Sequence, residues 1–394
     1  MSHLDSKNED RPSYDVHDSL NRSEWLKNVR RVVVKVGTHV LSREDNSLDE
    51  SFVDYLIGQV AAIRATGLQV AIVTSGAVGA GMGSMGISRR PTQIEMLQGL
   101  ASIGQTVLMH RYKTAARDRG MRVGQVLLTA GDLNRKRDYI HVQGALRALF
   151  QLDAIPVINE NDSVAVQELR FGDNDSLSAH IANLINADLL VIFTDIEGLF
   201  AGSPNDEPKP PLVRTVWNID RSIEQLCTSG GRGIGGMRTK VEAAKTLVAS
   251  GVPTVIAHGR EVTLDRILAG EPVGTFFVPQ ANHTRAHRRW ILARKIAGTL
   301  VIDTGAAKAL VERNMSLLPS GIRNVSGRFS PGDAVSIIDE DGREVARGLV
   351  RYSSTHAKVL AGHHSRDIQS LLGFHAGDDI VHRDNLIIVV NGTA

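Results

Sequence analysis

The sequence predicts an α/β protein, a three-layer α/β/α sandwich with a mainly parallel sheet, followed by a small, mostly β barrel. Strand and helix signals alternate from Arg30 to about Val278, which is typical of successive β-helix-β units. The strand segments are nearly continuous apolar runs, as expected where a parallel sheet is covered on both faces. From Gly298 onward β signals dominate, which indicates a second domain of different architecture.

The helices and strands of the α/β part are predicted from the spacing of apolar residues and from the residues that start and end each element. Apolar residues recur at helical spacing from Phe52 to Ile63, after a capping-box pattern at Ser47 and Glu50 and before a stop at Gly67. The same reasoning gives expected helices at 52–63, 91–120, 138–151, 176–186 and 239–250, and expected strands at 32–36, 68–73, 123–128, 154–158, 189–193 and 253–256.

The β signals of the tail have the pattern of a hairpin and a later strand. Strands over 334–338 and 344–352 flank the polar loop Asp339-Glu340-Asp341-Gly342, which suits a hairpin connection. A last strand is expected over 386–390. The complete division is a poorly ordered polar extension at 1–28, an α/β domain at 29–280, a basic linker at 281–297 and the β domain at 298–394.

Composition limits the classes of protein that this chain can be. Its 394 residues favour two domains, and its net charge of +2 excludes neither anionic nor cationic partners. The single cysteine, Cys227, excludes a disulfide framework within the chain and any cluster of cysteine metal ligands. No apolar run of membrane-spanning length and no secretory signal pattern occur, so we expect a soluble, cytoplasmic protein with no membrane partner.

Lys35 is the first candidate functional residue. It interrupts the apolar strand Val32-Val33-Val34-Lys35-Val36, and a buried ammonium is costly unless it is paired. Gly37 follows and lets a ligand approach the backbone. One interpretation is a lysine that reaches a transferred phosphate; the other is a lysine on an edge strand whose amine extends to water. The strand alone does not decide between them.

Two polar clusters lie beside predicted sheet ends. Asn159-Glu160-Asn161-Asp162 closes a strand, and Gly172-Asp173-Asn174-Asp175 precedes a helix. These residue types also dominate turns, yet turns alone do not need so many carboxamides and carboxylates. Asp162 and Asn174 could bind the ammonium and carboxylate of an amino acid, and Asp175 could orient a lysine or a magnesium-bound water. Because ligands bind beyond the carboxyl ends of parallel strands, the clusters are expected to converge.

Three further runs have the chemistry of phosphate binding. Thr74-Ser75-Gly76-Ala77 and Thr194-Asp195 each follow a predicted strand, and Gly235-Gly236-Met237-Arg238-Thr239-Lys240 precedes a helix. Backbone N–H groups and the dipole at a helix start favour anions, and Lys240 adds a full charge. The alternatives are a cap or turn at Thr194 and a flexible surface loop at the glycine-rich run.

Several common motifs do not apply to this chain. Gly81-x-Gly83-x-x-Gly86 and Gly231-x-Gly233-x-x-Gly236 match the dinucleotide fingerprint but lack its strand and acidic-residue context. No GxxxxGK[ST] motif, zinc-protease spacing or G-x-S-x-G motif is present. His283, His287 and the pair His363-His364 show no metal-ligand pattern.

Six of these runs, taken in order, resemble the amino-acid kinase family with a C-terminal PUA domain. They are VVKVGT, IVTSGAVGAG, VINENDSV, FGDNDSLSA, FTDIEGL and GGMRTK, and the β-rich tail follows them. The likeness is strongest to the members that use ATP and Mg²⁺ to phosphorylate the side-chain carboxylate of L-glutamate. It implies a homo-oligomer (dimer or tetramer) and feedback inhibition by proline. Because an acyl phosphate product would be labile, transient contact with glutamate-5-phosphate reductase is a further expectation, although no partner motif is visible.

The resemblance also implies residue roles at the matching positions. Lys35 and Lys240 would stabilise the moving phosphoryl group, with Asp175 organising the charged groups; Ser75, Asp162 and Asn174 would hold the substrate. Contacts to ATP would come from Lys35, Thr194, Asp195, Ile234, Gly235, Gly236, Met237, Arg238, Thr239 and Lys240. His39, Ile234 and Arg238 depart from the common family pattern, which puts only fine nucleotide contacts in doubt.

Two other functions remain open at the level of sequence. PUA domains often bind RNA, but residues 298–394 carry 10 Lys+Arg and 11 Asp+Glu, a net charge of −1, which argues against strong sequence-independent RNA affinity. The second alternative is a sibling kinase for another small acid.

Overall fold

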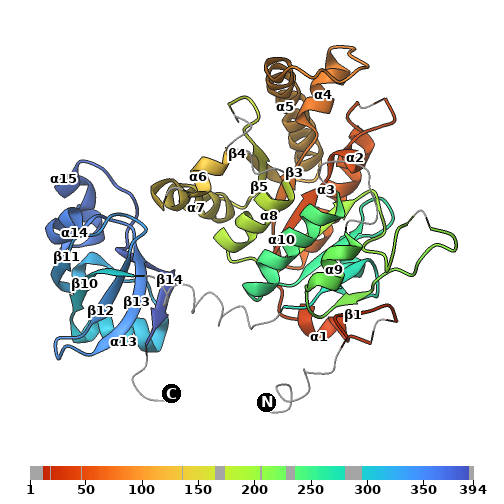
Figure 1. Cartoon of the computed structure of the whole chain (residues 1–394). Helices are drawn as coiled ribbons and strands as arrows, with labels where there is room; N and C mark the ends of the chain where they lie inside the picture. Colours follow the sequence, from red (N-terminus) through yellow and green to blue (C-terminus); the bar gives the residue numbers. More distant parts are fainter. Residues whose placement is uncertain are drawn as a thin grey trace. The chain divides into compact units, whose positions relative to one another are not determined.

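The computed structural model describes residues 12–389 apart from residues 18, 46, 135, 165–173, 205, 228–235 and 280–294. The chain divides into two compact units, each built around its own sheet (Figure 1). This division has a boundary near the predicted one at 280/281 and none near 28/29, and it groups residues 134–142 with the second unit. The predicted domain boundaries stay predictions. Most of the expected basic linker lies outside the described residues, and strand β10 already begins at Ile296.

The first unit contains a nine-stranded sheet in the order β1-β7-β9-β8-β6-β2-β3-β5-β4. Its ladders are parallel except for β1 with β7 and β8 with β9, so the predicted mainly parallel sheet is confirmed. The strands are β1 (Tyr14–Asp15), β2 (Arg31–Val36), β3 (Gln69–Thr74), β4 (Arg122–Leu128), β5 (Ala154–Glu160), β6 (Leu189–Thr194), β7 (Thr215–Val216), β8 (Thr254–His258) and β9 (Thr275–Phe277).

The helices of this unit cover both faces of the sheet, as predicted. They are α1 (Arg22–Leu26), α2 (Thr38–Leu41), α3 (Glu50–Ala65), α4 (Ala77–Ser84), α5 (Ile94–Arg117), α6 (Ala130–Asn134), α7 (Lys136–Gln151), α8 (Asn174–Leu184), α9 (Arg221–Leu226), α10 (Met237–Ala249) and α11 (Leu264–Leu268). None of the helices in the described ranges combines the length and apolarity needed to cross a membrane.

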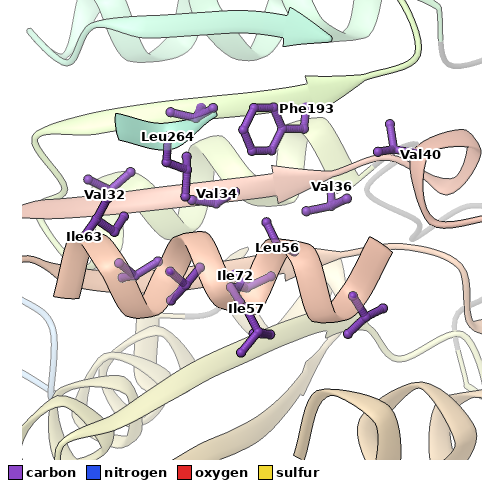
Figure 2. Packing of buried hydrophobic residues seen from close by; sticks show 14 of the residues in the cluster. Val32, Val34, Val36, Val40, Leu56, Ile57, Ile63, Ile72, Phe193 and Leu264 are labelled. Carbon is purple, nitrogen blue, oxygen red and sulfur yellow. The ribbon is translucent and has the colours of Figure 1, made fainter. Parts of the chain in front are cut away.

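The side chains of β2 alternate between the two faces of the sheet, so this strand contacts both helical layers. Val32, Val34 and Val36 are fully buried and belong to one apolar cluster with residues of α3, including Leu56 (Figure 2). Successive side chains of a strand point to opposite faces, so Lys35 points to the other layer, where α8 and α10 lie. Because β2 is paired on both sides, by β3 and β6, the edge-strand interpretation of Lys35 is excluded.

The glycine-rich run after β3 is a helix, which the sequence did not predict. Residues 77–84 form α4, and Gly81 faces Gly104 of α5 across a very close crossing. A Cβ atom on Gly81 would lie 2.0 Å from the Leu100 carbonyl oxygen, and one on Gly104 would lie 1.8 Å from the Ala77 carbonyl oxygen. The glycines therefore serve helix packing, and the dinucleotide interpretation of this run has no support.

Two other local expectations differ from the structure. The cap of α3 is Asp49, whose carboxylate accepts a hydrogen bond from the Phe52 N–H, rather than the expected Ser47. Residues 12–28 are also more ordered than the predicted extension, since they form β1 and α1. Arg22 is 2% exposed and donates hydrogen bonds to the carbonyl groups of Val273 and Arg214, which ties this segment to the sheet.

The second unit contains a five-stranded mixed sheet in the order β11-β10-β12-β13-β14. The predicted hairpin is confirmed, because β12 and β13 pair antiparallel around a loop in which Gly342 has φ +80°. The elements are β10 (Ile296–Ile302), α13 (Thr304–Arg313), η2 (Pro319–Gly321), β11 (Ile322–Gly327), β12 (Ala334–Ile338), β13 (Glu344–Val350), α14 (Ser354–Leu360), η3 (Ser365–Asp367), α15 (Ile368–Leu372) and β14 (Val381–Ile388). The α-helices α13, α14 and α15, which lie in the described part of this unit, were not expected from its sequence.

The crossing of α4 and α5 gives a direct test of this packing. Gly104→Ala should lower the midpoint of thermal unfolding by several degrees, because overpacking of this kind costs about 1–3 kcal/mol or more. Gly99 lies on the same helix with open space around its Cβ position, so Gly99→Ala should leave the midpoint unchanged or raise it through helix propensity. Equal midpoints for the two variants in a calorimetric scan would contradict the crossing.

Candidate functional site

The carboxyl ends of the central strands meet at one edge of the first sheet. In the parallel ladders Val36 lies opposite Thr74 and Phe193, and Thr194 lies opposite His258. The runs that follow these strands therefore converge, as the sequence predicted.

A buried cluster of three charged side chains lies behind this edge. The Lys35 Nζ is 2.5 Å from Asp175 Oδ1, and the Lys240 Nζ is 3.1 Å from Asp175 Oδ2. Lys35, Asp175 and Lys240 are 2%, 0% and 7% exposed. They come from β2, the first turn of α8 and the first turn of α10, so three elements distant in sequence meet at one carboxylate.

The charge of this cluster suits an anionic ligand. With both amines as ammonium and the carboxyl as carboxylate, the three groups together carry a net charge of +1. Burying charge away from water is costly unless it is compensated. An incoming phosphoryl group would supply negative charge at this point.

The start of α10 holds the cluster from one side. The Thr239 Oγ1 donates to Asp175 Oδ2 at 2.7 Å and also lies 3.0 Å from the Gly236 carbonyl oxygen. Met237 is the first residue of the helix, and Arg238 is exposed and pairs with Glu242. Ile234 and Gly235, which the sequence predicted to contact nucleotide, lie outside the described residues.

A second, mostly uncharged cluster surrounds Asn174, the neighbour of Asp175. The Asn174 Nδ2 lies 3.0 Å from the Thr74 carbonyl oxygen, 2.9 Å from Ser75 Oγ and 3.1 Å from Asn159 Oδ1. Ser75 and Asn174 are therefore brought together as predicted. Asp162 lies half-buried in the turn after β5.

The remaining predicted residues lie at the end of β6. The Thr194 Oγ1 donates to Asp195 Oδ1 at 3.0 Å, and the Thr194 carbonyl oxygen accepts from the Gly259 N–H at 2.9 Å. His39 and Asp195 are both exposed, with His39 Nδ1 4.0 Å from Asp195 Oδ2. His39 and Asp195 are therefore accessible to a ligand, whereas Thr194 is buried.

Two residues of this region received no role from the sequence. Asn159 is 1% exposed and bridges Asn174 to Gln105 of α5. Arg260 donates to the Val40 carbonyl oxygen at 2.8 Å and pairs with Asp49 at 2.7 Å, which fixes the segment after Gly37. Asn159 stood inside a polar run that was noticed; Arg260 follows the strand end at His258, and that position was its only signal.

Among the described residues, neither Cys227 nor a cluster of metal ligands supports a further site. Burial raises the pKa of the Cys227 thiol to about 11, so the thiol stays protonated at neutral pH and is a poor nucleophile. Among the residues that the structure describes, no group of three or more His, Cys, Asp or Glu side chains is placed to hold a metal ion.

Comparison with known proteins gives matches over most of the chain. The model of the "Amino acid kinase family" matches residues 30–258, and that of the "PUA domain" matches residues 298–372. The glutamate 5-kinase of Geobacter sp. (strain M21) is 44% identical over 372 residues, which is 93% of this chain and 100% of that protein. The glutamate 5-kinase of Caldanaerobacter subterraneus subsp. tengcongensis is 42% identical over 92% of this chain and 98% of that protein.

One further match is to a solved structure. The UMP kinase of Bacillus anthracis has a TM-score of 0.45 and 17% identity, covering 64% of this chain and 97% of that chain. The assignment to a family therefore rests on the sequence matches.

The cluster predicts an unusual response to removal of its carboxylate. Asp175→Asn should lower the free energy of unfolding by about 3–5 kcal/mol, because two buried ammonium groups lose their partner. The double variant Lys35→Met/Asp175→Asn should regain part of that loss, since one of the uncompensated charges is gone. Denaturant unfolding followed by circular dichroism measures both.

The matched control is an exposed pair on α10, the helix that provides Lys240. Glu242→Gln removes the partner of Arg238, which is fully solvated, and should leave stability almost unchanged. If Asp175→Asn were as mild as Glu242→Gln, or if removing Lys35 from it gave no recovery, the three groups would not act as one cluster.

Proposed function

The chain belongs to the amino acid kinase family, and on that premise we propose that it transfers the γ-phosphoryl group of ATP to the side-chain carboxylate of L-glutamate. The product is L-glutamyl 5-phosphate, and the reaction is the first step of proline biosynthesis. The observation that carries the proposal is the meeting of Lys35 and Lys240 at Asp175, beside the carboxyl edge of the sheet.

The chemistry needs positioning and charge neutralisation more than proton transfer. A glutamate side chain has a pKa near 4.3, so the attacking carboxylate is already ionised at neutral pH and requires no general base. Lys35 and Lys240 offset the repulsion between the anionic reactants and stabilise the charge that moves with the phosphoryl group. Asp175 keeps the two ammonium groups together and out of bulk water.

The two reactants would lie on either side of Asp175. Ser75, Asp162 and Asn174 hold glutamate, since they provide a hydroxyl, a carboxylate and an amide for its ammonium and α-carboxylate. ATP takes the other side, with contacts from Thr194, Asp195, Ile234, Gly235, Gly236, Met237, Arg238, Thr239 and the two lysines.

Magnesium would enter with the nucleotide. Mg²⁺ commonly keeps several waters and binds substrate phosphates together with few protein carboxylates. The described residues offer no ready-made cluster of metal ligands, which suits an ion held chiefly by the phosphates of ATP. Its chemical contribution is further charge neutralisation at those phosphates.

Steady-state kinetics with a panel of acids tests this function. The purified protein should turn over L-glutamate with MgATP much faster than aspartate, N-acetylglutamate or carbamate. Lys35→Met and Lys240→Met should each lower kcat by roughly 100-fold or more, the size seen when one preorganised charge-stabilising group is lost.

Lys245 provides the control on the same helix. It is exposed and paired with Glu224, so Lys245→Met should retain near-wild-type turnover. Preference for another acid would replace glutamate as the substrate, and near-normal kcat in both buried-lysine variants would remove their catalytic role.

We further propose that the protein is cytoplasmic, that it assembles as a dimer or tetramer, and that it passes its labile product to glutamate-5-phosphate reductase, by contact or by diffusion. Proline is proposed as a feedback inhibitor at or near the glutamate site. Adding proline should then raise the apparent KM for glutamate and leave kcat unchanged at saturating glutamate. A fall in kcat with constant KM would place proline elsewhere.

A further inference from the structure

One face of helix α5 carries two polar side chains that point to the sheet. Gln105 and Tyr112 are seven positions apart, which places them on the same side of the helix. Each begins a hydrogen-bond chain that ends at the Thr74-Ser75 dipeptide. We propose that Gln105 and Tyr112 are positioning residues for the amino-acid subsite, which they set through Asn159 and Thr74. The proposal rests on the function proposed above.

The Tyr112 chain has a fixed direction. The Tyr112 OH lies 3.0 Å from Thr74 Oγ1, and Thr74 Oγ1 donates to the Ser75 carbonyl oxygen at 3.2 Å. With its single hydrogen in the bond to the Ser75 carbonyl, the threonine hydroxyl accepts from the phenol in the first contact. Tyr112 is fully buried, which raises its pKa and keeps that proton in place.

The Gln105 chain is fixed by the backbone at both ends. The Asn159 Oδ1 accepts from the Glu160 N–H at 2.8 Å, so Asn159 Nδ2 is the atom that donates to Gln105 Oε1 at 2.9 Å. The Asn174 amide nitrogen faces Asn159 Oδ1 and the Thr74 carbonyl, both of which are acceptors. Neither amide can be turned over without losing hydrogen bonds.

These hydrogen-bond directions determine which donor and acceptor atoms of the subsite remain for a ligand. Ser75 Oγ accepts from the Asn174 amide, so the serine O–H is left to donate, which suits the α-carboxylate of an amino acid. The Asn174 Oδ1 is a buried acceptor without a hydrogen-bond partner among the described residues. It suits the ammonium group. The backbone therefore sets the polarity of the subsite, and Gln105 and Tyr112 of α5 hold Asn159 and Thr74 in the matching orientation.

The position of α5 is itself closely determined. Gly104 precedes Gln105 and touches the Ala77 carbonyl region at the start of α4. Ala77 in turn follows Ser75 and Gly76, which has φ +93°. The same crossing that holds α5 against α4 therefore keeps Gln105 at a set distance from the Ser75 turn.

Removal of single hydroxyl groups tests the Tyr112 chain. Tyr112→Phe and Thr74→Val should each raise the KM for glutamate roughly 3- to 10-fold, the net effect of one lost hydrogen bond. The KM for ATP and kcat should stay within about twofold, since uniform binding of one substrate is affected. Thr74→Ser keeps the hydroxyl and should behave like the wild type.

Gln105→Met removes the acceptor for Asn159 at nearly constant volume and should give the same selective rise in KM. The controls are Tyr55→Phe and Gln93→Met, which alter exposed residues away from these chains. Both should leave every kinetic constant unchanged. A purely structural role would lower the unfolding temperature and the active fraction in the test variants without moving the glutamate KM.

Two outcomes overturn the proposal. One is an unchanged glutamate KM in Tyr112→Phe, Thr74→Val and Gln105→Met; the other is a Thr74→Ser variant as impaired as Thr74→Val. Should the wild type prefer another acid of the panel, the proposed substrate fails, and the same comparison is made with that acid. Failure of the proposed substrate is therefore distinguishable from failure of the proposed positioning roles.

Discussion

The site depends on one buried carboxylate that holds two buried ammonium groups. Asp175 is 0% exposed and contacts Lys35 from a central strand and Lys240 from a helix far along the chain. Neither lysine could remain at such depth without compensation. The arrangement requires β2, α8 and α10 to pack in one register, so the proposed catalytic geometry depends on the same packing as the core of the sandwich.

Two neighbouring residues at the start of α8 divide the site. Asp175 faces the cations, where the phosphoryl group is proposed to move, and Asn174 faces Thr74, Ser75 and Asn159, where the amino acid is proposed to bind. Because the two residues are consecutive in the first turn of α8, the backbone holds the proposed phosphoryl and amino-acid halves at a fixed spacing. Such fixed spacing is what a reaction catalysed by positioning requires.

The sequence was informative where a residue conflicted with its surroundings. The dense polar run around Asn174 favoured function, and the parallel sheet followed from apolar strands. Lys35 in an apolar strand left function and an edge strand equally open, until β2 was found paired on both sides. The sequence was less informative where meaning depends on a neighbour in space. Gly81 and Gly104 indicate a helix crossing only when their contact in space is known. Tyr112 cannot be told from an ordinary core residue in the sequence, because its hydrogen-bond partner Thr74 is distant along the chain. Arg22 similarly orders a polar N-terminal segment through carbonyl groups that no local pattern indicates.

A crystal structure with MgADP, L-glutamate and an aluminium fluoride mimic of the phosphoryl group tests the central claim most directly. The account predicts that the ammonium groups of Lys35 and Lys240 both lie within hydrogen-bonding distance of the mimic, with Asp175 still between them. A mimic bound away from one or both lysines, with those amines contacting Asp175 alone, would contradict it.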